Sequence, residues 1–216
     1  MSDHNVIAID GPAASGKSSV ANALARRLGY AYVNSGAMYR AITWRVVSMN
    51  VASDDAVGVV DLLERSNVEI LLENGESVIR IDGVNPEPHL RDQLINENVS
   101  PVSGIVGVRD FLLTHLRNFA EDTDLVMEGR DIGSTVFPDT PYKFYIDASP
   151  EVRRLRRQVQ GQTDEISSRD RADSTRRASP LVIADDAQVI DSSHLTIDGV
   201  VGEIIGRLKL KGLAIT

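Results

Sequence analysis

The chain has 216 residues, no cysteine and a formal net charge of −8. Its length suits one large domain, or one domain with an insertion. The lack of cysteine excludes a disulfide framework and a thiolate metal site, and the acidic balance argues against an extended nucleic-acid surface. Residues 1–5 lack the basic start of a signal peptide, and no stretch is long enough to span a membrane, so we expect a cytoplasmic protein.

Strands and helices are predicted to alternate along the chain. The apolar run at residues 6–9 predicts a first strand. Apolar residues at helical spacing over residues 20–28 predict a helix, and Gly29 stands where its C-terminal cap is expected. The pattern continues with a strand at residues 31–33, a helix across residues 38–49 and a shorter helix over about residues 54–65.

A different pattern follows at residues 68–81. Two strand-like runs flank Glu73-Asn74-Gly75-Glu76, and an Asn-Gly turn between such runs is a strong hairpin signal. An antiparallel hairpin inside an alternating chain indicates an insertion. We expect it to cover about residues 66–100.

The alternation resumes after this insertion. The remaining predicted elements are a helix at about residues 106–120, strands at 125–127, 142–146 and 188–190, and a closing helix at 197–210. Strands separated by helices form a parallel sheet, and ligands bind beyond the carboxyl ends of its strands. We therefore expect an α/β fold of three layers, with a parallel central sheet flanked by helices and a small α+β insertion.

Residues 11–18 form a complete phosphate loop, Gly-Pro-Ala-Ala-Ser-Gly-Lys-Ser, between the first strand and the first helix. Its backbone N–H groups can turn toward phosphate, Lys17 can reach the β and γ phosphates, and the Ser18 hydroxyl can ligate Mg²⁺. The motif predicts a P-loop fold that binds a nucleoside triphosphate. The candidate binding residues are Gly11, Pro12, Ala13, Ala14, Ser15, Gly16, Lys17, Ser18 and Ser19.

Arginine is used unevenly. Only four of the 23 basic residues are lysines, and eight arginines lie between Arg153 and Arg177. The rigid fork of arginine suits phosphate oxygens, so this cluster in an acidic protein suggests anion binding. A solvated helix face would explain a single arginine equally well, so its position within a motif has to decide.

Several sequence words resemble those of the bacterial cytidylate kinases, in the nucleoside monophosphate kinase family. They are residues 9–12 with the phosphate loop, 34–40 (Asn-Ser-Gly-Ala-Met-Tyr-Arg), 128–133 (Glu-Gly-Arg-Asp-Ile-Gly), 136–139, 169–176 and 179–181. The resemblance covers nearly the whole chain. It implies one P-loop kinase domain over residues 1–216, with the insertion on the acceptor side and a short lid at about 153–177. It further implies a monomer that uses ATP and Mg²⁺ to convert CMP or dCMP to the diphosphate in pyrimidine metabolism.

The resemblance also implies roles for particular residues. Lys17, Arg130 and Arg176 correspond to catalytic residues, and Ser18 and Glu128 to the metal site. The acceptor phosphate would be held by Arg40, Arg130 and Arg176, with Arg169 as a further lid contact. Cytosine would be recognised by Ser100, Arg109 and Asp131, and the ribose by Asp173, with Ser35 also in the acceptor site. Arg157 corresponds to an ATP contact, together with Arg156, although Arg153 and Arg154 offer another pair one turn earlier.

The residues themselves leave alternatives open. Asp131 could cap a helix or form an ion pair, Ser100 before Pro101 could be a turn serine, and Asp173 could belong to a self-paired helix face. The chain also departs from the family pattern, which usually has Asp-Gly-Arg-Asp where this chain has Glu128 first. In addition, residues 158–168 form a shorter stretch than in the family, so the lid should be compact.

Three rival functions are a kinase for UMP, AMP or a hydroxyl metabolite, a GTPase-like switch, and a regulatory protein that has lost catalysis. Guanine-specific switches carry an Asn/Thr-Lys-x-Asp motif, in which Asp follows the lysine by two residues. None of the four lysines in this chain is followed by Asp at that distance. The residues that argue against the loss of catalysis are the intact Lys17, Ser18, Arg130 and Arg176.

Overall fold

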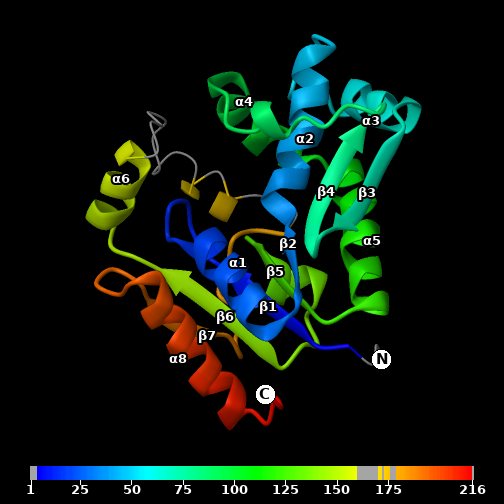
Figure 1. Ribbon diagram of the computed structural model, residues 1–216. Helices are drawn as coiled ribbons and strands as arrows, with labels where there is room; N and C mark the ends of the chain where they lie inside the picture. The colour runs from blue at the N-terminus through cyan, green and yellow to red at the C-terminus, as the bar shows by residue number, and fades with distance from the viewer. Residues whose placement is uncertain (1–3, 160–169, 172, 176–178, 216) are drawn as a thin grey trace.

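The computed structural model describes residues 4–159, 170–171, 173–175 and 179–215 (Figure 1). A single sheet with strand order β3-β4-β2-β5-β1-β6-β7 runs through it. Its strands are β1 (Val6–Asp10), β2 (Ala31–Asn34), β3 (Val68–Glu73), β4 (Glu76–Ile81), β5 (Leu125–Gly129), β6 (Tyr142–Asp147) and β7 (Gln188–Asp191). All neighbouring strands are parallel except β3 and β4. The predicted α/β class is thus confirmed.

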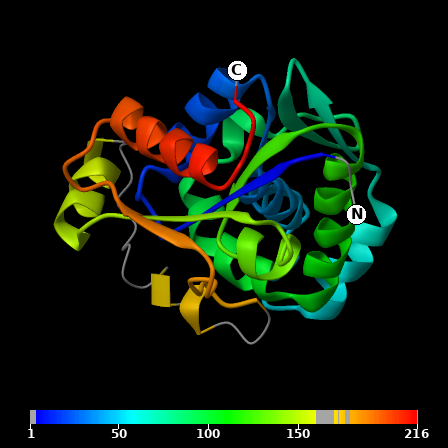
Figure 2. The ribbon, with the colours of Figure 1, turned by 90° about the horizontal axis from the view of Figure 1, so that it is seen from below.

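Helices cover both faces of this sheet. The helices are α1 (Lys17–Leu28), α2 (Ser35–Ser48), α3 (Ala56–Arg65), α4 (Gln93–Gly104), α5 (Val106–Asp122), α6 (Pro150–Val159) and α8 (Ile197–Leu210), with the short turns η1 (Glu87–His89) and η2 (Ile132–Val136). Figure 2 shows α1 and α8 on one side of the strands and α5 on the other. None of the described helices is long and apolar enough to cross a membrane.

The alternation of side chains along β1 explains the three layers. Successive residues of a strand point to opposite faces of the sheet. Val6 and Ala8 join a core with α2 and α5, whereas Ile7 and Ile9 join a second core with α1 and α8. Because both faces are covered, the strand is apolar at every position up to Asp10.

The predicted hairpin forms, and it extends the sheet. Asn74 and Gly75 have φ values of 52° and 78°, as a tight β3–β4 turn requires. The hairpin joins β2 through the pairing of Tyr32 with Glu76, and the Tyr32 N–H donates to the Gly75 carbonyl at 2.8 Å. The hairpin is therefore attached to the parallel part of the sheet beside β2.

Helix α4 was not predicted from the sequence. Pro101 lies inside it, and a proline removes a helical hydrogen bond. Ile95, Val99 and Val102 are nevertheless buried, and α4 packs against α2 and α5. Burial of this apolar face outweighs the poor local propensity. The helix continues past residue 100, the predicted end of the insertion.

Candidate active site

The phosphate loop connects the carboxyl end of β1 to the start of α1. Gly11 is required by space, because a Cβ there would lie 2.2 Å from the Ile146 carbonyl oxygen. Gly16 has φ 91° at the N-cap of α1 and Ala14 has φ 58°. This left-handed geometry forms a turn whose N–H groups can surround an anion, at the positive end of the helix dipole.

Arginines of α6 hold this loop from the side. Arg156 donates to the Ser15 carbonyl at 3.0 Å and to the Ser192 carbonyl at 2.7 Å. Arg153 donates to the Ala13 carbonyl at 3.3 Å and pairs with Asp170. Arg157 lines the open cleft beside the loop. Arg153 and Arg156 thus fasten the phosphate loop. Arg157 instead faces the space where a nucleotide would lie.

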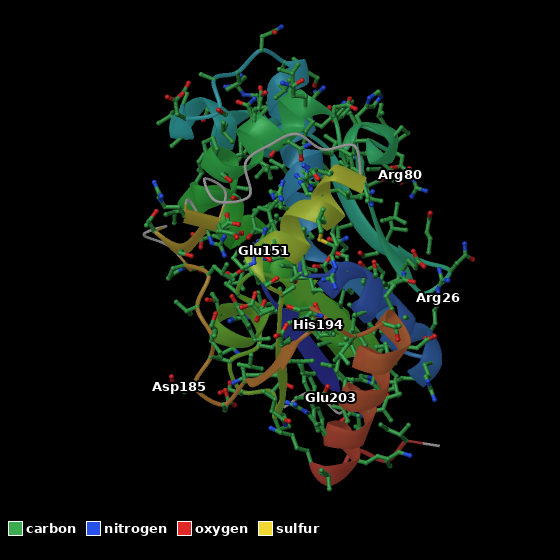
Figure 3. The ribbon with its side chains drawn as sticks, turned by 90° about the vertical axis from the view of Figure 1, so that its left-hand side faces the viewer. Arg26, Arg80, Glu151, Asp185, His194 and Glu203 are labelled. Atoms are coloured by element: carbon green, nitrogen blue, oxygen red, sulfur yellow. The ribbon has the colours of Figure 1, made fainter. Side chains whose placement is uncertain are left out.

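A cleft of about 1230 Å³ runs from the phosphate loop, along α1, to the hairpin and η1. Arg40 on α2 lines it and donates to the Leu90 carbonyl at 2.6 Å. Arg26 on α1 lies on the same side of the molecule as Arg80 of the hairpin (Figure 3), and it pairs with Glu76 at 3.1 Å. The cleft is large enough to hold a nucleotide between the phosphate loop and the insertion.

Ser18 and Glu128 both line this cleft and contact each other. The Ser18 hydroxyl donates to Glu128 Oε1 at 2.7 Å, and Glu128 at the end of β5 is only 3% exposed. Burial raises the pKa of the Tyr32 phenol, which therefore stays protonated and donates to the same oxygen at 3.5 Å. Among the described residues no group of three or more metal-ligating side chains occurs. Two protein oxygens fit Mg²⁺, which usually keeps several waters and takes phosphate ligands from its nucleotide.

A smaller cavity of about 80 Å³ opens beside the cleft. Lys17, Gly36 and Glu128 line both spaces, so the cavity meets the cleft next to the phosphate loop. Its wall combines residues from five separate parts of the chain. Those named in the sequence analysis are Ser35, Ser100, Arg130, Asp131 and Asp173.

Asp131, which lines this cavity, belongs to a buried ion pair, whereas its partner Arg109 is not among the residues that line it. Arg109 on α5 donates to Asp131, and the two side chains are 8% and 5% exposed. Arg109 also donates to the Ser103 carbonyl at 3.1 Å and lies over the Tyr39 ring, 5.5 Å from its centroid. Such a pair is costly to bury unless its remaining hydrogen-bonding capacity is used. Because Asp131 lines the cavity, its carboxylate is the member of the pair that a polar ligand there would meet.

Arg130 connects the acceptor side to the phosphate loop. Its Nη1 donates to the Gly11 carbonyl at 2.5 Å, and its Nε pairs with Asp173 at 3.0 Å. Ser35 is buried and donates to the Glu128 carbonyl at 2.8 Å, which fixes the start of α2 against β5. Arg169 and Arg176 lie outside the described residues.

Two acidic residues that sequence reasoning left without a role also contact this site. Asp170 accepts from the Ala13 N–H at 3.1 Å. Asp10 accepts from the N–H groups of Ile132 and Gly133, both at 2.8 Å. The signal for Asp10 was present in the sequence, since it is a lone acid at the end of an otherwise apolar strand.

The environment of Asp10 predicts a pH-dependent stability. Burial raises the pKa of Asp10 to about 7, and the Asp131 charge adds to this, whereas its two N–H donors and Lys17 oppose it. A carboxyl with a raised pKa stabilises the fold below its ordinary value of 3.8, and this contribution is lost as pH rises to about 7. Relative to Asp10→Asn, we expect the wild-type free energy of unfolding to fall by up to about 4 kcal/mol over that range. Urea unfolding of both proteins at pH 5 and pH 8 checks this, because about 3 kcal/mol of the fall is expected between those two pH values. An unchanged difference would contradict it.

Fold and site together define a P-loop phosphotransferase with a polar cavity beside its phosphate loop. The family model described as cytidylate kinase matches residues 7–210. A cytidylate kinase of Desulforamulus reducens is 40% identical over 216 residues, covering 95% of this chain and 97% of its own. One of Alkaliphilus oremlandii is 40% identical over 214 residues, covering 94% and 97%. The chain belongs to the cytidylate kinase family, whose members transfer a phosphoryl group from ATP to CMP or dCMP, which confirms the resemblance seen in the sequence.

A solved structure shows the same fold. An uncharacterized protein from Eubacterium ventriosum superposes with a TM-score of 0.50 at 13% identity, covering 95% of this chain and 99% of its own. At that identity the likeness concerns the fold alone.

Proposed function

We propose that this chain binds Mg-ATP at the phosphate loop and holds CMP or dCMP in the neighbouring cavity, with Asp131, Arg109 and Ser100 reading the cytosine. The products are ADP and CDP or dCDP. The observation that carries the proposal is Asp131, which is paired with buried Arg109 and lines a cavity that meets the ATP cleft at Lys17.

The chemistry of the base fits this pair. Cytosine presents an exocyclic amino donor next to ring acceptors, which complements a carboxylate beside a guanidinium. Uracil has a carbonyl oxygen where cytosine has the amino group. The Asp131 carboxylate would then face another hydrogen-bond acceptor and no donor. A site built to hydrogen-bond a polar group of its ligand strongly rejects a ligand that lacks that group.

The transfer itself needs positioning and charge neutralisation rather than a general base. The attacking phosphate oxygen of the acceptor is already anionic, and the transferred group carries its charge on equatorial oxygens. Lys17 would neutralise the donor phosphates, while Arg40, Arg130 and Arg176 would hold the acceptor phosphate. Arg130 stands between the two sides, because it touches the phosphate loop at the Gly11 carbonyl.

Ser18 and Glu128 would hold Mg²⁺, and Arg157 would contact ATP. When bound, Mg²⁺ supplies positive charge to the β and γ phosphates. We expect Glu128→Gln to raise the Mg²⁺ concentration for half-maximal turnover by about tenfold or more. Glu76→Gln is the matched control, because Glu76 lines the same cleft on the hairpin. Equal Mg²⁺ dependence in the two variants would remove Glu128 from the metal site.

The remaining organisation follows the family resemblance. We propose that residues 66–100 form the acceptor-side insertion, that residues 153–177 form a short lid with Arg169 and Asp173 contacting the nucleotide, and that the enzyme is a cytoplasmic monomer without nucleic-acid or membrane partners. The pairing of Asp173 with Arg130 in the acceptor cavity supports the lid assignment.

Calorimetric titration tests the acceptor assignment without relying on turnover. CMP, dCMP and UMP are titrated separately into the protein. We expect CMP and dCMP to bind at least about tenfold more tightly than UMP, a difference of about 1.4 kcal/mol. Equal affinities for CMP and UMP would contradict base recognition by Asp131.

A further inference from the structure

Asp131 occupies a helix-capping position but does not cap the helix. It directly precedes η2, and its side chain makes no capping hydrogen bond to that turn. Aspartate at such a position ordinarily accepts from the first N–H groups of the helix. Here its carboxylate, which lines the acceptor cavity, pairs with buried Arg109 instead.

Asp10 supplies the missing cap from a distant strand. One carboxylate oxygen accepts from the Ile132 N–H and the other from the Gly133 N–H, each at 2.8 Å. Asp10 is 6% exposed, so these N–H groups are satisfied in a dry environment. Buried backbone donors that lose their acceptor are costly.

The second of these contacts depends on a glycine. A Cβ at Gly133 would lie 3.4 Å from the Asp10 carboxylate and 3.1 Å from Cγ of the buried Lys143. The backbone of η2 is thus packed closely against the end of β1.

Asp10 also sits between the two halves of the site. It immediately precedes Gly11 of the phosphate loop, and its partner across the sheet, Gly129, immediately precedes Arg130. Two sets of hydrogen bonds therefore join residues 10–11 to residues 130–133. One set runs from η2 to Asp10, and the other runs from Arg130 to Gly11.

We propose that Asp10 is a positioning residue for base selection: by capping η2 from β1, it leaves the Asp131 carboxylate turned toward Arg109 and the acceptor base. This inference rests on the proposed role of Asp131 in cytosine recognition. It assigns the acid of the first strand to the acceptor side of the reaction, although it adjoins the ATP loop in sequence.

Asp10→Asn tests the proposal at nearly constant size. The asparagine amide can accept from only one of the two N–H groups and opposes the other with a donor. The second N–H would then compete for the carboxylate of Asp131, which directly precedes η2. We expect the kcat/KM ratio of CMP over UMP to fall by about tenfold, mainly through the KM for CMP, with the KM for ATP within about threefold of wild type.

Two further variants separate positioning from stability. Gly133→Ala crowds the same contact and should reduce selectivity in the same direction, which keeps the test decisive if Asp10→Asn folds poorly. Thr140→Val removes a buried hydrogen bond from Thr140 to the Val6 carbonyl, at the opposite end of β1. It should lower the melting temperature without changing selectivity.

A double variant decides whether Asp10 acts through Asp131. In an Asp131→Asn background, Asp10→Asn should produce no further loss of selectivity. An additional tenfold loss in that background, unchanged selectivity in Asp10→Asn, or an equal loss in Thr140→Val would each overturn the inference. If Asp131→Asn itself leaves selectivity intact, base recognition by Asp131 fails, and the role of Asp10 fails with it. If Asp131→Asn loses selectivity but Asp10→Asn does not, only the proposed role of Asp10 is overturned.

Discussion

Replacing Lys17 with alanine should lower kcat by about two to three orders of magnitude. Lys17 lines both the cleft and the acceptor cavity, and its ammonium group donates to the Pro12 carbonyl at 3.2 Å. It is therefore the lysine placed where the γ phosphate would pass from donor to acceptor. Its removal takes away a charge that the transition state uses more than the ground state does.

Single-turnover release of ADP from Mg-ATP with saturating CMP measures this loss directly. The melting temperature should change little, because the fold retains the arginines that hold the loop. Lys209→Ala on α8 is the control, since it removes a lysine far from the cleft. A kcat for Lys17→Ala within about threefold of wild type would exclude Lys17 from the transfer step.

Asp131→Asn should reduce kcat/KM for CMP by about two to three orders of magnitude while leaving the KM for ATP nearly unchanged. The asparagine amide presents a donor where cytosine also presents one. The same amide can donate to the carbonyl of uracil, so the preference for CMP over UMP should shrink or reverse. The variant also leaves the Arg109 guanidinium with a weaker partner, so some loss of stability is expected.

A second ion pair provides the matched control for that loss. Lys143 is buried on β6 and pairs with Asp186 at 2.9 Å, outside the cavity. The Asp186 side chain is 55% exposed, so Asp186→Asn should lower stability by less than Asp131→Asn does, without altering the CMP to UMP ratio. If both aspartate variants change that ratio equally, the effect of Asp131 is one of stability and not of recognition.

The start of the fold was predictable, whereas α4 was not. A strand, a phosphate loop and a helix with Gly29 at its end carry their own local signals, and the Gly29 N–H does donate to the Ala25 carbonyl. In α4 the local sequence argues against a helix, because Pro101 lies inside it. Only the packing against α2 reveals the apolar face of this helix, and a sequence does not state which helix lies opposite.

The candidate site shows the same division. The phosphate loop is contiguous in sequence, so Lys17 and Ser18 follow from residues 11–18 alone. Arg109 and Asp131 come from different elements, and only the family resemblance brought them together before the structure did. Whether Arg153 or Arg157 accompanies Arg156 on the loop depends on how α6 faces the loop, which residue spacing does not fix. Asp10 lies within residues 9–12, which resemble the family, but its partners are backbone groups 122 and 123 residues away. No side-chain pattern indicates such partners.

The most direct test of the central claim is a coupled ADP-release assay with Mg-ATP against CMP, dCMP, UMP, AMP and GMP, each at several concentrations. A cytosine-reading acceptor cavity predicts fast ADP release with CMP and dCMP and slow release with the other three. Comparable kcat/KM values for UMP or AMP would contradict that account of the cavity, while the phosphate-loop fold would remain.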